Sequence, residues 1–174
     1  MIKILSGKFK GRKLNKITTK TVRPTQAKVR KSIMDSIRDF KSKSILDLFA
    51  GSGTLGIEGM SRDAESVCFV DNDYKAIKVL KKNIELLELD EQCSIVKNDA
   101  IKFLKENQKS YDIIFADPPY GQYDLKDIFP YIKKKLKNNG VFCFEQKKSK
   151  LTIENDFKIK NYGSTQVIFW EKKI

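Results

Sequence analysis

The 174-residue chain contains no histidine, which excludes His-ligated zinc sites and histidine general bases together. It has only three cysteines, Cys68, Cys93 and Cys143, each in or beside an apolar, strand-like stretch. This odd, widely spaced set predicts buried thiols rather than a disulfide or a metal site, and we expect no metal. Long apolar runs are also absent, since none approaches the roughly 18 residues that a spanning helix needs. Lysines interrupt the N-terminal apolar residues too early for a secretory signal, so we expect a cytoplasmic protein.

Acidic residues are scarce in the first quarter of the chain. Residues 1–43 hold 14 Lys and Arg against two Asp, a balance of +12, whereas residues 44–174 hold 21 basic and 20 acidic residues, a balance of +1. A merely solvated, lysine-rich surface predicts an even spread instead. The segregation favours a polyanionic partner, and nucleic acid fits better than lipid because the stretch lacks Trp and apolar bulk. We therefore predict a basic N-terminal extension, residues 1–43, ahead of a core at residues 44–174.

The core alternates strand-like and helix-like segments. Strands are expected at residues 44–49, 66–71, 93–97, 112–117, 140–145, 157–162 and 165–171. Helices are expected in the core at residues 53–62, 73–89, 100–107 and 125–136, and in the extension at residues 25–40. This order predicts an α/β fold with a doubly wound, mostly parallel seven-stranded sheet and helices on both faces. The last two strands are joined by a short turn and should form a hairpin, which makes one strand antiparallel. Another hairpin is expected at residues 2–6 and 9–14, around a Gly7-Lys8 turn.

A glycine-rich stretch follows the first expected core strand. Residues 47–58 read DLFAGSGTLGIE, in which GSGTLG fits the G-x-G-x-x-G spacing of a dinucleotide loop, with Asp71 twenty residues after Gly51. Glycines also permit tight turns without any ligand, so this spacing alone is weak evidence. Asp47 lies four residues before Gly51 and should face the same crevice, beyond the carboxyl ends of the strands. An acid there disfavours a pyrophosphate and suits a cation.

Two more acids, Asp71 and Asp99, end the next two expected strands. S-adenosylmethionine matches the three acids, because it has a cationic ammonium, a sulfonium, a ribose for Asp71 and an adenine amine for Asp99, but no phosphate. Each aspartate taken singly could be solvated or could cap the following helix. Three in register favour a cofactor crevice. An NAD-dependent oxidoreductase stays open as an alternative.

The fourth expected core strand closes with FADPPYG, residues 115–121. One interpretation is a rigid turn, since proline fixes φ and ends strands. The chemical interpretation is that Asp117 and the carbonyl of Pro118, stiffened by Pro119, accept hydrogen bonds from an exocyclic amine and leave its lone pair available. Tyr120 would then stack on a base turned out of its helix. No strong base is needed, because the nitrogen becomes acidic as it gains the methyl group.

These stretches together resemble the RsmD family of 16S ribosomal RNA guanine-N2 methyltransferases, which are class I, Rossmann-like enzymes that use S-adenosylmethionine. The similarity runs almost end to end and is carried by KILSGKFKGRKL, VRPTQAKVRKSI, ILDLFAGSGTLGIEGMSR, Asp71 with Asp73, NDA at residues 98–100, DPPY and FEQK. DPPY alone is shared with adenine-N6 DNA methyltransferases, whereas the Arg23-Pro24-Thr25 element is more specific. One departure is Asp71, where the family usually has Glu.

The resemblance implies methylation of a guanine N2 amine in 16S rRNA of the small ribosomal subunit or its assembly intermediates, by a protein that we expect to be a monomer. It implies cofactor binding by Asp47, Phe49, Ala50, Gly51, Ser52, Gly53, Asp71, Asn72, Asp99 and Ala100. It implies a catalytic motif at Asp117, Pro118, Pro119 and Tyr120. RNA contacts are expected at Lys8, Lys10, Arg12, Lys13, Arg23, Thr25 and Arg30. An adenine-N6 DNA methyltransferase and a non-catalytic RNA-binding assembly factor remain alternatives.

Overall fold

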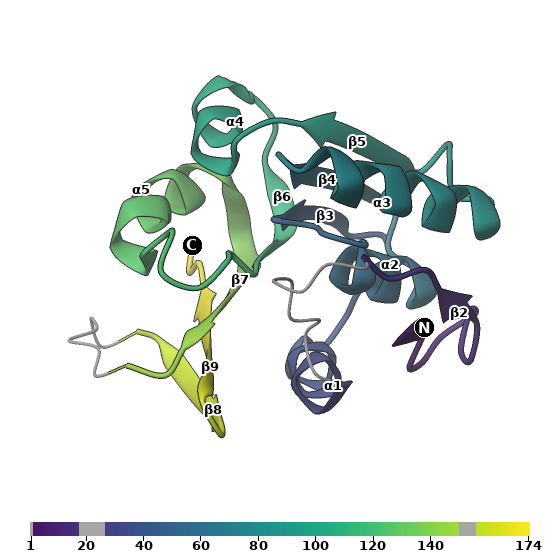
Figure 1. Cartoon of the computed structure of the whole chain (residues 1–174). Helices are drawn as coiled ribbons and strands as arrows, with labels where there is room; N and C mark the ends of the chain where they lie inside the picture. The colour runs from purple at the N-terminus through teal and green to yellow at the C-terminus, as the bar shows by residue number, and fades with distance from the viewer. Residues whose placement is uncertain (1, 18–26, 150–155) are drawn as a thin grey trace.

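The computed structural model describes residues 2–17, 27–149 and 156–174 (Figure 1). The strands are β1 (Ile2–Lys3), β2 (Lys13–Leu14), β3 (Ser44–Leu48), β4 (Ser66–Asp71), β5 (Cys93–Lys97), β6 (Tyr111–Ala116), β7 (Leu136–Lys147), β8 (Lys158–Tyr162) and β9 (Thr165–Glu171). The helices are α1 (Ala27–Ser36), α2 (Thr54–Ser61), α3 (Tyr74–Leu86), α4 (Ala100–Glu106) and α5 (Leu125–Lys135). No helix in these ranges has the length and apolar character that crossing a membrane requires.

Seven strands form one sheet in the order β5-β4-β3-β6-β7-β9-β8. The neighbours from β5 through β7 pair in parallel, while β9 runs antiparallel to both β7 and β8. The predicted fold, mostly parallel with one antiparallel strand, is confirmed. The chain moves outward from β3 to β5 and then returns to β6, so the strand order reverses between β3 and β6. Doubly wound sheets bind ligands at the carboxyl end of such a switch point.

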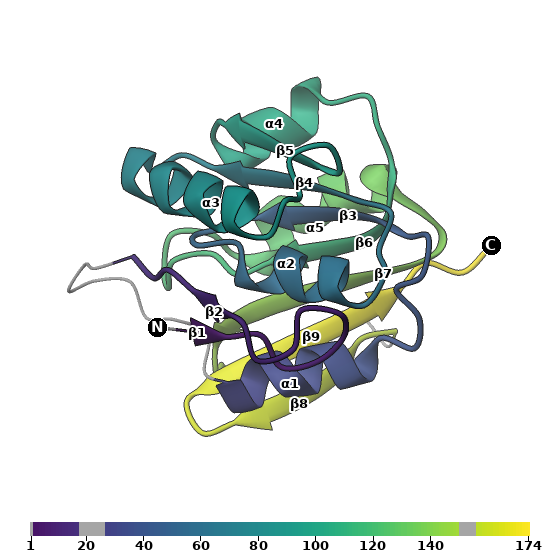
Figure 2. The ribbon, with the colours of Figure 1, turned by 90° about the vertical axis from the view of Figure 1, so that its right-hand side faces the viewer.

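Helices cover both faces of the sheet (Figure 2). Side chains alternate along a strand, so on β3 Ile45 enters a core with α1, α2 and α3, while Leu46 and Leu48 enter a core with α4 and α5. One face of α3 packs into the first of these cores, since Ile77, Leu80 and Ile84 are buried together with Leu87, the C-cap residue of the helix. All three cysteines are free; Cys143 is buried as predicted, whereas Cys68 and Cys93 are only half-buried.

The N-terminal hairpin differs from the expected two-residue turn. Its strands pair only at Ile2↔Leu14 and Lys3↔Lys13, and the loop between them bonds to α2. The backbone N–H of Leu5 donates to Glu58 Oε1 at 2.7 Å, and that of Lys8 donates to the Ser61 carbonyl at 2.8 Å. Gly7 has φ 81°, and a Cβ there would lie 1.7 Å from the Ser61 carbonyl oxygen. The loop therefore takes its shape from contact with α2 rather than from a tight turn of its own.

The strand β7 is longer than the predicted residues 140–145, because the Asn138-Asn139-Gly140 segment continues the sheet instead of ending it. Asn139 has φ 60°, and its N–H donates to the Lys172 carbonyl at 2.7 Å. The register with β6 shifts between Tyr111 and Ile113 to accommodate this segment. A sequence typical of a turn thus forms an irregular strand, because Lys172 supplies an acceptor for its backbone.

Candidate active site

The glycine loop, residues 49–53, connects β3 to α2 at the switch point. Gly51 and Gly53 have φ 57° and 82°, and Phe49 also has a positive φ of 60°, which is uncommon for a bulky residue. A Cβ on Gly53 would lie 2.4 Å from Leu80 Cδ1, so α3 packs tightly beneath the loop. Around Gly51 the nearest atom to such a Cβ is Ile17 Cδ1, at 3.8 Å. The loop is closely packed below Gly53 and more open at Gly51.

The sequence predicted that Asp47 faces the open crevice. In the structure it lies beneath the glycine loop instead. The side chain is buried, and its Oδ2 accepts a hydrogen bond from the Gly56 N–H at 2.9 Å. Burial raises the pKa of Asp47 well above its usual value, and the charges of Asp117 and Asp71 raise it further. The carboxyl group therefore satisfies an N-terminal amide of α2, the capping alternative weighed for each acid singly.

Asp71, at the end of β4, connects its own strand to the glycine loop. Its Oδ2 accepts from the Gly51 N–H at 2.8 Å, and its Oδ1 accepts from the Asp73 N–H at 2.8 Å. Burial raises the pKa of this half-buried acid, and the hydrogen bonds partly oppose that effect. A carboxylate oxygen has two lone pairs, so each oxygen can accept one more hydrogen bond. The neighbouring Asn72 is exposed.

Asp99 is the N-cap residue of α4 and also contacts an aromatic residue that the sequence analysis missed. Its Oδ1 accepts from the Lys102 N–H at 2.9 Å, and its Oδ2 accepts from the Tyr123 hydroxyl at 2.5 Å. The Tyr123 hydrogen bond is the largest cause of the lowered pKa of Asp99, and the same bond raises the pKa of Tyr123 to about 12. The Tyr123 ring packs against Phe49, with ring centroids 4.8 Å apart. Nothing in the sequence marked Tyr123, because this contact joins two loops that are distant along the chain.

The loop's hydrogen bonds allow a test of which cofactor it suits. The Gly51 N–H is bonded to Asp71, the Gly56 N–H to Asp47, and the Gly53 N–H to the Ala50 carbonyl at 2.8 Å. A pyrophosphate would need such amides as donors and would meet two carboxylates beside them. A phosphate-free cation suits the same groups, because the carboxylates oppose an anion and attract a positive charge. The residues present therefore fit S-adenosylmethionine better than a dinucleotide.

Asn83, on α3, is a second residue that the sequence did not mark. This fully buried amide donates to the Ser52 carbonyl at 2.9 Å and to the Asn15 carbonyl at 3.1 Å. Its oxygen accepts from the Asn15 N–H at 2.8 Å. The N-terminal extension and the glycine loop are thereby held on one side chain, and Ile4 and Leu14 of the extension lie in the same hydrophobic core as α2 and α3.

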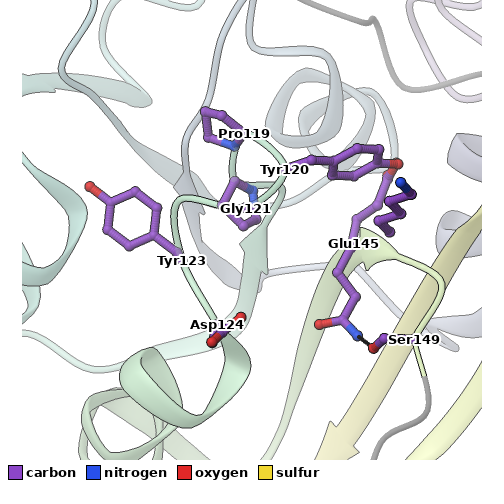
Figure 3. Close-up of a pocket in the computed structure, with 10 residues that line it drawn as sticks. Pro119, Tyr120, Gly121, Tyr123, Asp124, Glu145 and Ser149 are labelled. Carbon is purple, nitrogen blue, oxygen red and sulfur yellow. Dashed lines mark hydrogen bonds between the residues drawn. The ribbon is translucent and has the colours of Figure 1, made fainter.

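A cavity of about 390 Å³ lies between the loop after β6 and the end of β7 (Figure 3). Its lining residues are Pro118, Pro119, Tyr120, Gly121, Tyr123, Asp124, Glu145, Gln146, Lys147 and Ser149. This volume is within the range of about 300–1,000 Å³ that is common for small-molecule pockets. The cavity is thus built largely from the two sequence motifs DPPY and FEQK, which are separated by 23 residues in the chain.

The four residues of the DPPY loop, residues 117–120, differ in how far they are exposed. Asp117 is half-buried directly before the cavity, Pro118 is buried, and Pro119 is exposed. Tyr120 is 41% exposed, while its hydroxyl forms a hydrogen bond of 3.0 Å with Thr165 Oγ1 on β9. Figure 3 shows Tyr120 on the same side of the loop as Glu145, and Tyr123 on the opposite side. The ring of Tyr120 is therefore anchored at one end and accessible on its surface.

The basic residues of the hairpin lie away from this cavity. Lys8, Lys10, Arg12 and Lys13 are all exposed, and Arg12 Nη2 donates to the Leu86 carbonyl, at the end of α3, at 2.8 Å. The hairpin loop contacts Ser61 at the C-terminus of α2, whereas the glycine loop precedes its N-terminus. An eight-residue helix is about 12 Å long. The lysines near the hairpin loop are consequently about one helix length from the crevice.

Arg30 does not occupy the position expected of an RNA contact. Its side chain is buried at 3% exposure, its Nη2 donates to the Lys3 carbonyl at 2.8 Å, and its Nε lies 3.4 Å from Glu58 Oε1. Glu58 also pairs with Arg62 at 2.5 Å. Arg30 is therefore part of a buried ion-pair network between α1 and α2, because it faces the core side of its helix. The other two expected contacts on this segment, Arg23 and Thr25, lie outside the described residues.

Comparisons with known proteins agree over nearly the whole chain. The family model described as conserved hypothetical protein 95 matches residues 2–171. Ribosomal RNA small subunit methyltransferase D of Buchnera aphidicola subsp. Baizongia pistaciae is 36% identical over 97% of this chain and 89% of its own length. A solved Escherichia coli protein, 25% identical, superposes with a TM-score of 0.86 over 99% of this chain and 98% of that chain. The Thermus thermophilus 16S rRNA N2 G1207 methyltransferase, solved with AdoMet and guanosine, shares the fold with a TM-score of 0.69 at 21% identity, over 90% of this chain and 45% of that chain.

Proposed function

Because the chain belongs to the RsmD family of S-adenosylmethionine-dependent ribosomal RNA methyltransferases, we propose that it methylates the exocyclic N2 amine of a guanine in 16S rRNA. The observation that carries the proposal is the cavity between the DPPY loop and β7. The DPPY loop follows β6, which is the neighbour of β3, and the glycine loop after β3 is hydrogen-bonded to Asp71. A cavity of this size can receive a single nucleobase turned out of its helix. The substrate is the small ribosomal subunit or an assembly intermediate of it.

In this proposal the carboxyl ends of β3, β4 and β5 hold the cofactor. S-adenosylmethionine supplies a methyl group on a positively charged sulfur, which becomes a neutral thioether when the methyl leaves. Asp71 has lone pairs left for the two ribose hydroxyls, and Asp99 sits where it can accept from the adenine amine. Asp47 acts from beneath by fixing the first turn of α2. The other residues proposed to contact the cofactor are those of the glycine loop and the residues that follow Asp71 and Asp99, namely Phe49, Ala50, Gly51, Ser52, Gly53, Asn72 and Ala100.

The DPPY loop orients the reacting amine. The two hydrogens of the amine donate to the Asp117 carboxylate and to the Pro118 carbonyl, which leaves the nitrogen lone pair free for the methyl carbon. A new N–C bond forms as the S–C bond breaks, and the surplus proton passes from nitrogen to Asp117 or to water. Pro118 has no N–H, and Pro119 fixes the backbone around its carbonyl. The accessible ring of Tyr120, anchored by Thr165, supports the face of the base.

The basic hairpin positions the RNA without reading its sequence. Lys8, Lys10, Arg12 and Lys13 are exposed, and the two lysines near the hairpin loop lie about one helix length from the crevice, so they fit phosphates some nucleotides away from the target. Residues 1–43, which include this hairpin, carry +12 of the net charge of +13, and phosphate contacts of this kind dominate the affinity of proteins for RNA. The extension therefore contributes binding energy, and the cavity contributes base selection.

The test is to map the methylated nucleotide. Small subunits from a strain that lacks the enzyme are incubated with the protein and methyl-labelled S-adenosylmethionine, and the RNA is digested to nucleosides. The label is expected as N2-methylguanosine at one position of 16S rRNA, with less transfer to protein-free 16S rRNA. Label in N6-methyladenosine would identify an adenine methyltransferase instead. No transfer to subunits, assembly intermediates or free rRNA, despite bound cofactor, would support a non-catalytic assembly factor.

A further inference from the structure

We propose that Glu145, on β7, selects guanine over adenine-like bases by accepting a hydrogen bond from the ring N1–H beside the reacting amine. This inference rests on the proposed function, since it names how the same cavity recognises its base. Among the described residues, two carboxylates line the cavity, Glu145 and Asp124. Asp124 lies at the surface, 3.6 Å from Lys126, with its side chain 69% exposed. Glu145, at 6% exposure, is the one that a bound base would meet away from water.

The sheet register places Glu145 beside Asp117. Ala116, the last residue of β6, pairs with Phe144 on β7 in parallel, so Asp117, directly after β6, lies beside Glu145. Strand side chains alternate, and Phe115 and Cys143, two residues earlier, both face the core with α2 and α3. Asp117 and Glu145 therefore project toward the same face of the sheet from strand ends about 5 Å apart. The charges of both carboxylates reach the buried thiol of Cys143. Burial is the main cause of the raised pKa of this thiol, and the charges of Glu145 and Asp117 raise it further.

Another polar residue of the cavity wall is less suited to this role. The Gln146 amide nitrogen donates to Ser149 Oγ at 3.0 Å and to Gln166 Oε1 at 3.0 Å, which uses both of its hydrogens. Its orientation is thus set by neighbours within the sheet and the following loop. Glu145 differs because its carboxylate is buried at the cavity wall, on the side of the DPPY loop where Tyr120 lies (Figure 3).

The chemistry of guanine fits two neighbouring acceptors. The N2 amine and the N1–H are adjacent donors on one edge of the ring, so an amine held at Asp117 brings N1–H toward the next acceptor along the sheet. A base with an unprotonated N1 would present a lone pair to a buried carboxylate at the same place. Sites that bind a substrate N–H through buried groups reject analogues that lack it, because the protein group loses its partner. Glu145 would accordingly discriminate on N1, independently of the amine that reacts.

2,6-Diaminopurine separates the two effects, since it keeps the 2-amine but has no hydrogen on N1. Once the modified nucleotide is mapped, small subunits are assembled from ligated 16S rRNA with guanine or 2,6-diaminopurine at that position. Single-turnover methyl transfer to the 2-amine is measured for wild type, Glu145→Gln and Glu171→Gln. Glu171 is an exposed control on β9 that pairs with Val141, toward the opposite end of β7. Cofactor affinity and thermal unfolding of each variant show whether the fold is kept.

Wild type and Glu171→Gln should prefer guanine by roughly 100-fold. In Glu145→Gln the ratio should fall at least tenfold, because the glutamine amide can donate to the unprotonated N1 of 2,6-diaminopurine. An equal loss of rate on both bases, with the ratio unchanged, would overturn the proposal. Equal wild-type rates on the two bases would overturn it without any variant, so a Glu145→Gln protein that does not fold leaves the test intact. Failure of the proposed function is distinct, because wild type would then make no N2-methylguanosine.

Discussion

The two halves of the sheet's carboxyl edge are built differently. At the ends of β3, β4 and β5, an aspartate accepts hydrogen bonds from backbone N–H groups. Asp47 accepts from Gly56, Asp71 accepts from Gly51 and Asp73, and Asp99 accepts from Lys102. At the ends of β6 and β7, the DPPY loop and Glu145 line a cavity instead. The first half is held in shape by its own acids, whereas the second half leaves space. This division suits a preorganised cofactor site beside a receptacle for a base that arrives from a much larger RNA.

The largest effect is expected on the cavity half. Asp117→Ala should lower the turnover of methyl transfer by about 1,000-fold or more, because the interaction with the amine matters at the reacting nitrogen, while cofactor affinity stays within a few fold. Single-turnover transfer to small subunits and calorimetry with S-adenosylmethionine measure the two quantities. Asp124→Ala removes an exposed acid that lines the cavity beside Asp117; it is the control and should keep most of the activity. Activity of Asp117→Ala within tenfold of wild type would discredit its orienting role.

A smaller loss is expected when the cofactor half of the edge is altered at Asp71. Asp71→Ala removes the acceptor of the Gly51 and Asp73 amides, and we expect cofactor affinity to fall about 10- to 100-fold, as the loop loses an anchor and the ribose loses an acceptor. Calorimetric titration with S-adenosylhomocysteine measures it. Asp73→Asn is the control, since asparagine also caps helices and should preserve the bond to Lys75. Unchanged affinity in Asp71→Ala would place the cofactor away from β4.

A smaller effect is expected from the basic hairpin. Lys8→Ala with Lys10→Ala should weaken small-subunit binding about tenfold and lower the salt slope of binding by about 2, one for each phosphate contact. Cofactor affinity should not change. Filter binding at several salt concentrations measures the affinity for small subunits and its salt slope. Lys109→Ala with Lys158→Ala, at exposed lysines elsewhere on the surface, is the control pair. An unaltered salt slope would remove the hairpin from the RNA footprint.

Deleting the whole hairpin would be a poorer test than these substitutions. The extension buries Ile4 and Leu14 in the core, and Asn15 shares Asn83 with the glycine loop. Loss of the hairpin would therefore alter both stability and the cofactor site, and the separation between RNA binding and cofactor binding could not be measured. Point substitutions at exposed lysines leave these internal contacts in place.

The smallest effect concerns the pH dependence of stability. The raised pKa of Asp47 means that the folded protein keeps this proton to higher pH than the unfolded chain. From the ordinary aspartate pKa of about 3.9 up to the raised value, the folded state binds more protons, so wild-type stability falls as pH rises. Asp47→Asn removes this titration and retains an oxygen for the Gly56 N–H, so its stability should decline less over that window. Urea unfolding at several pH values measures the difference, and identical slopes would show that Asp47 does not titrate as described.

The sequence predicted the layout of the core well, because period-two strands and helical faces depend on local pattern. Residues 66–71, 93–97 and 165–171 were predicted with the observed bounds. The orientation of single side chains and the shape of loops depend on tertiary contacts, which the local sequence pattern does not reveal. Arg30 looked like part of a basic RNA surface, yet its helix turns it toward Glu58, and the Gly7 loop follows α2 rather than its own turn preference. Tyr123 and Asn83 carried no signal, because each bridges segments that only the fold brings together.

The division of the sheet edge into a cofactor site and a base cavity can be tested by a crystal structure of the protein with S-adenosylhomocysteine and guanosine. We expect the adenosine at Asp71 and Asp99, and guanine in the cavity with its N2 amine at Asp117 and the Pro118 carbonyl. Cofactor bound away from the β4 and β5 ends, or a base that approaches without entering the cavity between the DPPY loop and β7, would contradict it.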